Sequence, residues 1–287
     1  MFGILNINKP PGWTSRDAVN RVQKFVRPAK VGHAGTLDPL ATGVLVVGIG
    51  PATRLIEYIQ QMPKEYRGTF LLGRVSASDD IETEATEIAN SPIPSLSEIE
   101  TVLPQFLGRI DQIPPAYSAV KIAGQRAYAL ARQGKEVTIT PRPVEIYDIQ
   151  ITVYEYPKLE LLIRCGSGTY IRSLGRDLAE CLGTGAIMSQ LVRTRIGDFR
   201  LEQTISPVDL TIEKIQDHLQ PPQLAVRHLP VMQLSVDQSR ELSFGRTIAG
   251  SESQECAAVD EQGNLIAILK EKSPGLLKPH INFAPSA

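Results

Sequence analysis

Apolar residues recur every three or four positions in three parts of the chain, and this spacing predicts helices with one buried face. The first predicted helix begins at Ser15, and the last begins at Tyr170 or Ile171. The middle one follows Ser95, whose spacing from Glu98 fits a capping box. The positions expected to be buried are Val19, Val22 and Val26 in the first helix, Leu96, Ile99, Leu103 and Phe106 in the second, and Ile171, Leu174 and Leu178 in the third.

Shorter apolar runs between turn-forming residues predict strands. The expected strands span residues 5–7, 68–72, 144–154 and 159–164, with a hairpin of residues 257–259 and 265–269 near the end of the chain. Strands with helices packed against them indicate an α+β fold. We therefore predict a mixed, mainly antiparallel central sheet flanked by helices.

Proline-rich and charged stretches divide this pattern into parts. The Gln-Pro-Pro-Gln sequence at 220–223 predicts a linker between a large domain, residues 1–222, and a small β-rich domain, residues 228–287. Residues from about 111 to 140 are rich in Pro, Gly, Lys and Arg, which indicates an insertion that projects from the large domain. The acidic stretch at 79–87 is expected to be an exposed loop.

Composition favours a cytoplasmic protein without membrane association. The chain has 287 residues, of which 42% are hydrophobic and 21% charged, as in ordinary globular proteins. Its longest apolar runs are far shorter than a membrane span, and we expect no secretory signal. Cys165, Cys181 and Cys256 are scattered without a C-x-x-C pair, which predicts reduced thiols and no zinc site.

The net charge of −1 hides an uneven distribution along the chain. Residues 1–75 carry ten Lys and Arg against four Asp and Glu, and residues 105–200 carry thirteen against nine. Residues 76–104 carry seven acidic residues and no Lys or Arg. Basic segments of this kind are compatible with a phosphate-rich partner such as RNA, although chance also produces them.

One carboxylate, Asp38, lies in a loop of small residues just before the apolar run at 44–47. Several glycines let the backbone of this loop pass close to a bulky ligand, and Pro39 restricts the conformation of Asp38. This pattern fits an active-site loop followed by a rigid strand. It also fits an aspartate that only caps a turn, so local chemistry leaves both interpretations open.

The same loop, Gly-His-Ala-Gly-Thr-Leu-Asp-Pro-Leu-Ala-Thr-Gly at 32–43, resembles the catalytic motif of the TruB family, the bacterial-type tRNA pseudouridine-55 synthases. The resemblance extends from residue 5 to about residue 199 and implies the pseudouridine synthase fold. A fainter similarity near the C-terminus implies a short PUA-like RNA-binding domain. Four further blocks agree in order: Lys9-Pro-Pro-Gly-Trp-Thr-Ser15, Lys64-Glu-Tyr-Arg67, Ile113-Pro-Pro-Ala-Tyr-Ser-Ala-Val-Lys121 and Gly168-Thr-Tyr-Ile-Arg172.

The resemblance implies a reaction that breaks the N1–C1′ bond of uridine, rotates the uracil and rejoins it through C5. The target nucleotide must be flipped out of the base stack of the RNA to enter a pocket. We expect no cofactor or metal. Asp38 is implied as the nucleophile or base, without a choice between the two, and Arg172 as its cationic partner. Tyr66 is implied to face the uracil and relay a proton, although alone it reads as an ordinary strand tyrosine.

The remaining implied site residues bind the substrate. His33 would help displace the target nucleotide, Tyr170 would support the pocket floor, and Leu191 would touch the base. Without the motif, a lone histidine in a loop is more often a solvated turn residue and an isolated leucine is nearly always a packing residue, whereas Tyr170 could equally belong to the core. The candidate contacts to RNA phosphates are Lys9, Lys64, Arg67, Lys121, Arg126 and Arg193.

The chain departs from the family pattern at residues 76–80. The usual Thr-Asp-Thr-x-Asp is replaced by Ser-Ala-Ser-Asp-Asp, and Thr83 stands where a glycine is usual. Asp80 is therefore left outside the predicted catalytic set.

The leading hypothesis is an isomerase that acts on uridine 55 in the T stem-loop of tRNA, as a monomer without guide RNA or a protein partner. One alternative is a non-catalytic tRNA-binding or tRNA-folding protein on the same scaffold. Another is a synthase inside a guide-RNA complex, which the compact C-terminal tail disfavours.

Overall fold

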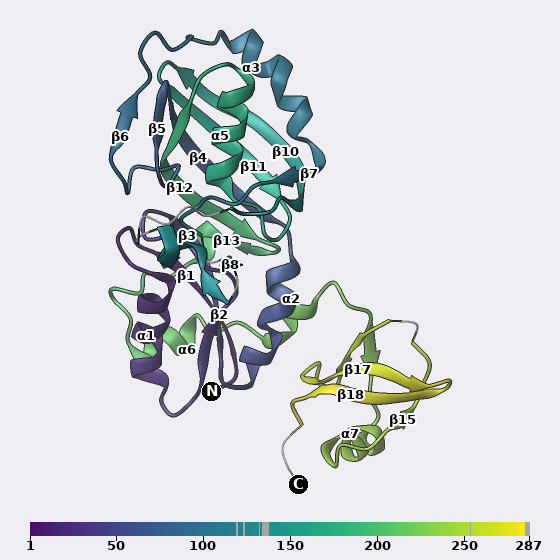
Figure 1. Ribbon diagram of the computed structural model, residues 1–287. Helices are drawn as coiled ribbons and strands as arrows, with labels where there is room; N and C mark the ends of the chain where they lie inside the picture. The colour runs from purple at the N-terminus through teal and green to yellow at the C-terminus, as the bar shows by residue number, and fades with distance from the viewer. Residues whose placement is uncertain (119, 123, 132, 134–137, 253, 285–287) are drawn as a thin grey trace.

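The computed structural model describes residues 1–287 except 119, 123, 132, 134–137, 253 and 285–287, and it leaves out the side chains of 121, 122, 126, 129 and 131. Within this part of the chain, the backbone forms one large sheet with helices against it and a second, smaller sheet near the C-terminus (Figure 1). Two further sheets have two strands each, and one of them pairs β5 Arg74–Ser76 with β6 Ala85–Glu87. None of the described helices is long and apolar enough to cross a membrane.

The large sheet has nine strands in the order β1-β3-β12-β4-β11-β10-β7, with β2 beside β3 and β13 beside β12. Strands β3 and β12 run parallel, and the other pairs are antiparallel. The predicted mixed, mainly antiparallel sheet is confirmed. The strands are β1 Gly3–Lys9, β2 Val31–His33, β3 Thr42–Ile49, β4 Lys64–Leu72, β7 Gly108–Gln112, β10 Arg142–Glu155, β11 Lys158–Cys165, β12 Ala186–Ile196 and β13 Phe199–Arg200.

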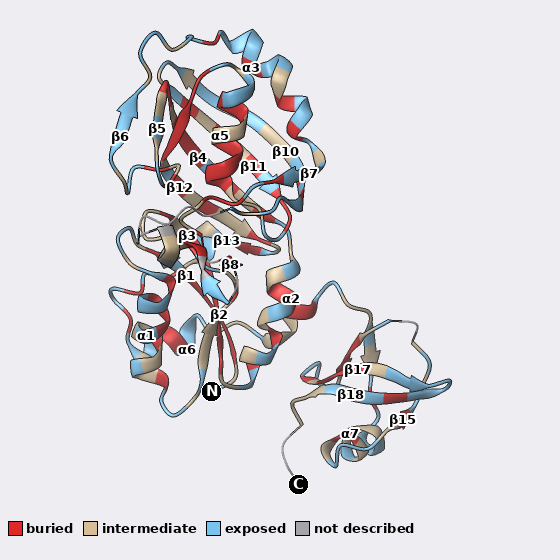
Figure 2. Ribbon diagram, in the orientation of Figure 1, coloured by how far each residue is buried: buried red, intermediate tan, exposed pale blue. Residues whose placement is uncertain are grey.

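Helices pack on both ends of this sheet. The helix α1 covers β1 and β3 through its buried valines, and α5 lies across β4 and β12, where a cluster of buried apolar residues fills the space (Figures 1 and 2). Gly175 permits this close approach, because a Cβ there would lie 2.1 Å from the Phe70 ring. The helices of the large part are α1 Ser15–Val26, α2 Ile56–Gln61, α3 Leu96–Val102, α5 Ile171–Cys181 and α6 Ile212–Asp217, with 3-10 helices at Gly50–Leu55, Leu103–Phe106 and Leu201–Gln203.

Most of the elements expected from the apolar pattern are present. The first and last predicted helices are α1 and α5, and Ser95 and Glu98 form the expected capping box before α3. Leu96 was expected to be buried, and that prediction is wrong, because its side chain points outward from the first turn and is 44% exposed. The strand expected from residue 68 begins four residues earlier, at Lys64.

The segment between β7 and β10 contains the predicted insertion. Its described residues form a two-stranded pair, β8 Lys121–Ile122 with β9 Gln125–Arg126, followed by α4 Ala127–Ala131. In its first part, Pro114, Pro115 and Ser118 are buried. That the segment projects from the large domain stays a prediction. Residues 134–137 of the predicted insertion lie outside the described residues.

The C-terminal sheet has the order β14-β16-β17-β18-β15, and its hairpin of β16 and β17 is the one predicted. Ala257, Leu265 and Ile268 from this sheet share a hydrophobic cluster with the large part of the chain, and Phe2 stacks on Phe283. The division into two domains therefore stays a prediction. The elements are a 3-10 helix Pro222–Val226, β14 Val231–Gln233, α7 Val236–Ser243, β15 Ile248–Ala249, β16 Cys256–Val259, β17 Leu265–Ser273 and β18 Leu276–Asn282.

Candidate active site

The loop that carries Asp38 joins β2 to β3 and is held at several points. The hydroxyl of Ser15, at the start of α1, accepts from the Leu37 N–H at 2.8 Å and donates to the Leu37 carbonyl at 3.0 Å. The Ala41 N–H donates to the carbonyl of Asp38 at 3.1 Å. At Gly43, where φ is +98°, a Cβ would lie 2.3 Å from the Arg193 carbonyl, so the loop can enter β3 only through a glycine. The backbone of Asp38 is thus fixed on a rigid scaffold.

Two predicted phosphate contacts, Lys9 and Arg193, hold this loop from within, and for Lys9 the prediction is wrong because the residue is fully buried. The side chain of Lys9 has no exposed surface, and its ammonium donates to the carbonyls of Pro10, Trp13 and Pro39 at 2.9, 2.6 and 3.3 Å. Burial lowers the pKa of Lys9 to about 8.

Arg193 is 1% exposed and donates to the carbonyls of Val44 and Gly35 at 2.7 and 3.1 Å. Because buried carbonyls need donors, Lys9 is engaged inside the protein and not on an RNA-facing surface. Arg193 also lines the cavity described below, so its role as a phosphate contact stays a prediction.

Lys9→Met is expected to reduce the free energy of unfolding by about 2–3 kcal/mol, because three carbonyls around the Asp38 loop lose a charged donor. Affinity for RNA should change less than twofold. Denaturant unfolding and a salt titration of RNA binding measure the two effects, with the exposed Lys30→Met as the control. Weaker RNA binding with a flatter salt dependence, at unchanged stability, would return Lys9 to the set of phosphate contacts.

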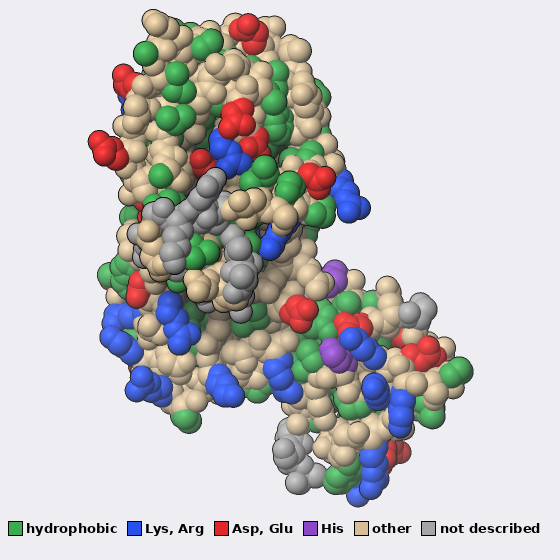
Figure 3. Space-filling model, in the orientation of Figure 1, with side chains coloured by type: hydrophobic (Ala, Val, Ile, Leu, Met, Phe, Trp, Pro, Cys, Tyr) green, Lys and Arg blue, Asp and Glu red, His purple; other side chains and the backbone are tan. Residues whose placement is uncertain are grey.

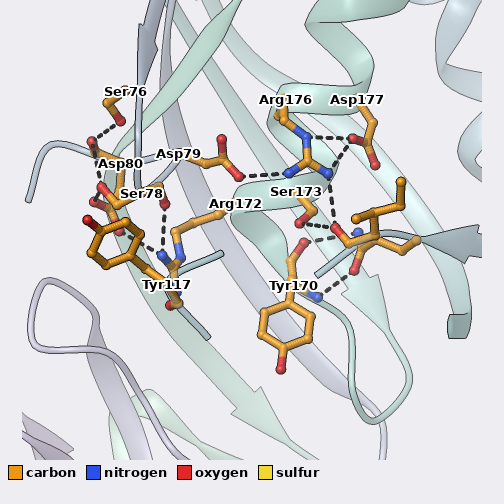
Figure 4. Close-up of polar contacts among 12 residues, drawn as sticks. Ser76, Ser78, Asp79, Asp80, Tyr117, Tyr170, Arg172, Ser173, Arg176 and Asp177 are labelled. Carbon is orange, nitrogen blue, oxygen red and sulfur yellow. Dashed lines mark hydrogen bonds and ion pairs between the residues drawn. The ribbon is translucent and has the colours of Figure 1, made fainter. Parts of the chain in front are cut away.

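Asp38 meets Arg172, which lies in the first turn of α5. The Arg172 Nη2 donates to Asp38 Oδ2 at 2.9 Å, so the two residues predicted as partners are in contact. The same guanidinium donates to the carbonyls of Ser78 and Tyr117 at 2.8 and 3.0 Å (Figure 4). The Arg172 side chain is 6% exposed, whereas that of Asp38 is 41% exposed.

Asp80 is a second carboxylate on Arg172, and the sequence analysis missed it. Its Oδ2 lies 3.2 Å from Arg172 Nη1, and its side chain is fully buried. The other carboxylate oxygen, Oδ1, accepts from the hydroxyl of Ser78 and from the Glu82 N–H at 2.9 Å. The expectation that residues 79–87 form an exposed loop is therefore wrong at Asp80, which is buried, and at Ala85–Glu87, which forms the strand β6. Asp80 stands at the position of the last aspartate in the family pattern, which could have marked it as a site residue. The changed residues at 76–79 led to its exclusion.

These residues line a cavity of about 360 Å³ between the Asp38 loop, β4, β12 and the start of α5. Tyr66, Leu191 and Tyr170 from the predicted set face it, and so does Lys64. Burial raises the pKa values of Tyr66 and Tyr170, so both hydroxyls keep their protons at neutral pH. The Lys64 side chain is largely buried, its ammonium donates to the Gln60 carbonyl, and burial lowers its pKa to about 8. The cavity therefore combines an accessible carboxylate, an aromatic wall and a titratable amine.

Two further predicted residues, His33 and Arg67, are not among the residues that line this cavity. His33 is half-buried on β2, and burial together with Arg193 lowers its pKa, so its ring is neutral at physiological pH. Arg67 is exposed on β4. Lys121 and Arg126 face each other across the β8–β9 pair, and their side chains lie outside the described part of the chain.

A larger hollow of about 580 Å³ lies next to the C-terminal sheet. Tyr58, Met62 and His228 line it, together with Asp198 and Arg227, an exposed pair whose charged atoms are 3.3 Å apart. The Asp198–Arg227 ion pair is exposed to solvent, so its two charged groups interact only weakly and resemble any pair on a protein surface. The Asp38–Arg172 pair instead combines a buried guanidinium with an accessible carboxylate, which is typical of functional sites. We therefore place the chemistry in the smaller cavity.

A carboxylate on a rigid loop, backed by a buried arginine and facing an aromatic wall, is suited to attack or deprotonate a bound nucleoside. The fold is that of a pseudouridine synthase, an isomerase, and this cavity is the candidate for its active site. Residues 23–171 match the sequence model described as TruB family pseudouridylate synthase (N terminal domain). The chain belongs to the TruB family, which confirms the resemblance seen in its motifs.

Relatives similar to the chain cover nearly its whole length. The protein called tRNA pseudouridine synthase B of Gloeothece citriformis is 40% identical over 279 residues, which are 93% of this chain and 90% of that protein. The protein of the same name from an Arthrobacter species is 38% identical over 305 aligned positions, covering 100% and 98%. A chain in the crystal structure of a Cbf5-Nop10-Gar1 complex is 28% identical with a TM-score of 0.78, covering 99% and 86%.

Proposed function

We propose that the protein converts uridine 55 in the T stem-loop of tRNA into pseudouridine, with Asp38 as the nucleophile or base. The observation that carries this proposal is the asymmetry of the Asp38–Arg172 pair. The carboxylate is 41% exposed toward a cavity of about 360 Å³, while its counter-ion is buried behind it. The names of the relatives support tRNA as the substrate.

The proposed reaction exchanges one glycosidic bond for another. The N1–C1′ bond breaks, a C5–C1′ bond forms, C5 loses its proton and N1 gains one, so no atoms are added or removed. Asp38 either attacks the nucleoside or removes a proton from it. Tyr66 and Leu191 bound the space for the flipped uracil, and the protonated Tyr66 hydroxyl can relay a proton.

The RNA strands outside the pocket need a positive surface. Figure 3 shows Lys and Arg side chains gathered below the insertion, over the part of the molecule that contains α1. The N-terminal 75 residues carry ten Lys and Arg against four Asp and Glu, and of the ten only Lys9 and Lys64 are buried. Such a surface would hold the phosphates of a folded tRNA while the target nucleotide enters the cavity. We propose that the protein does this alone in the cytoplasm, as a monomer, and that Cbf5-type assembly with partners belongs to its structural relative.

The purified protein and a tRNA transcript test the proposal directly. Wild-type protein should form one pseudouridine at position 55, detected by chemical mapping, and none in a transcript with cytidine at that position. A non-catalytic tRNA-binding protein would bind both transcripts without isomerising either. A guide-dependent synthase would act only after a guide RNA is added, so these outcomes separate the three hypotheses.

Affinity for tRNA is expected to fall as pH rises above about 8, by about tenfold by pH 9.5, because Lys64 then loses its charge. The protonated ammonium attracts phosphate and the neutral amine does not. Burial lowers the pKa of Lys64, so this attraction is lost at a lower pH than for an exposed lysine. Binding isotherms at pH 7 and 9.5 measure it. Lys64→Arg should remove the pH dependence, since a guanidinium stays charged.

The matched control is Lys158→Met, which should leave the pH dependence intact. Lys158 pairs with Leu71 at one end of the β4–β11 ladder, and Lys64 pairs with Cys165 at the other end. An unchanged pH dependence in Lys64→Met would mean that Lys64 does not face the RNA.

A further inference from the structure

The first turn of α5 carries two residues of the site but has no cap of its own. Tyr170 is the N-cap residue, and its side chain makes no capping hydrogen bond. Helix starts leave backbone N–H groups without partners, and a buried start must find acceptors elsewhere. The chain supplies that acceptor from a distant strand.

Gln112, the last residue of β7, binds the backbone of Tyr170 through both ends of its carboxamide. Its Oε1 accepts from the Tyr170 N–H at 2.8 Å, and its Nε2 donates to the Tyr170 carbonyl at 3.0 Å. The side chain is 1% exposed, and 58 positions separate the two residues. Because one backbone group can only donate and the other can only accept, the orientation of the amide is fixed.

The next residue of the chain extends this contact along the helix. The Ile113 carbonyl accepts from the Ser173 hydroxyl at 2.8 Å and from Arg176 Nη2 at 3.0 Å, as Figure 4 shows beside Tyr170. The end of β7 is thus joined to the first two turns of α5 by four hydrogen bonds. Gln112 contributes the two that act on the backbone at the start of the helix.

We propose that Gln112 is a positioning residue for the isomerisation, acting through the first turn of α5. Arg172 lies two residues beyond Tyr170, and its guanidinium must meet Asp38 and Asp80 within 3.2 Å at the same time. A small rotation of this turn would lengthen both contacts, and displacements of this size reduce catalysis strongly. The proposal rests on the proposed function.

The geometry demands a side chain that donates and accepts at once. An ionised glutamate at this position can accept from the Tyr170 N–H. Its second oxygen carries negative charge, so it cannot donate to the Tyr170 carbonyl and repels it. A protonated glutamate has one donor and one acceptor and reproduces both bonds. Burial favours the protonated form, so an introduced carboxyl should gain its proton within an accessible pH range.

Gln112→Glu is therefore expected to be about tenfold slower than wild type at pH 8 in single-turnover assays on tRNA, and to recover to within about threefold at pH 5.5. Gln112→Met should be at least as slow at both values, because it restores neither bond. The affinity for tRNA should stay within about threefold of wild type in both variants. A constant ratio of Gln112→Glu to wild type across this range would overturn the proposal.

Gln150→Glu is the matched control, since Gln150 is exposed on β10 and donates to Asp148 at 2.7 Å. Its ratio to wild type should not depend on pH. Amide hydrogen exchange at Tyr170 is the second measurement, and it should accelerate about tenfold in Gln112→Glu at pH 8. Unchanged exchange would also overturn the proposal. A wild-type protein inactive on tRNA would contradict the proposed function alone, because the exchange measurement needs no substrate.

Discussion

Asp38→Asn is expected to abolish pseudouridine formation while tRNA affinity falls less than about tenfold, which is about 1.4 kcal/mol. The neutral amide keeps the shape of the side chain but can neither attack nor accept a proton as a carboxylate does. Binding should persist because one carboxylate contributes repulsion, not attraction, toward a polyanion. Single-turnover assays and filter-binding titrations with the same tRNA preparation measure the two quantities.

Two controls make this result decisive. Asp148→Asn changes a half-buried carboxylate on β10 that is not among the residues lining the candidate cavity, and it should have wild-type turnover. Asp38→Ala should match Asp38→Asn, which excludes trace activity from an asparagine that has reverted to aspartate by deamidation. Turnover above background in Asp38→Ala would remove Asp38 from the chemical step and would weaken the proposed function.

The parts of the fold that follow from local pattern were predictable from the sequence. The buried valines of α1 and the Ser95–Glu98 capping box depend only on neighbours in the chain, and both are present. Leu96 was misplaced because an apolar residue at the edge of a helical face can point to solvent at small cost. Lys9 was misplaced because a lysine is usually exposed, and only the three-dimensional structure reveals the carbonyls that its ammonium satisfies.

The residues of the candidate site also fall into those that the sequence could predict and those that it could not. The Asp38–Arg172 contact was anticipated because family motifs mark both residues, although 134 positions separate them. Asp80 was excluded because its neighbours depart from the motif, yet the physical requirement is only a buried carboxylate on the second edge of the guanidinium. Gln112 gave no signal, since its partners are backbone atoms 58 positions away. Contacts to backbone atoms leave no pattern in side-chain types, so a single sequence cannot reveal them.

Replacement of Arg172 tests how these contacts work together. Arg172→Met is expected to lower the free energy of unfolding by about 3–5 kcal/mol, because Asp80 stays buried without its counter-ion. Turnover should fall at least about a hundredfold, because Asp38 also loses the group that orients it. Arg172→Lys should recover only part of both losses, since an ammonium cannot hold two carboxylates and two carbonyls in one plane. Chemical unfolding and single-turnover rates measure the two effects separately.

Asp80→Asn in the Arg172→Met background separates stability from catalysis. Removing the stranded charge should restore about 2–3 kcal/mol of stability without restoring turnover, because Asp38 still lacks its partner. Arg74→Met is the matched control. Its guanidinium pairs with Glu87 at 2.7 Å and is more exposed, so its loss should cost less than about 1 kcal/mol and leave turnover near wild type. Wild-type turnover in Arg172→Met would show that Asp38 needs no arginine, and the asymmetric ion pair would then no longer support the proposed function.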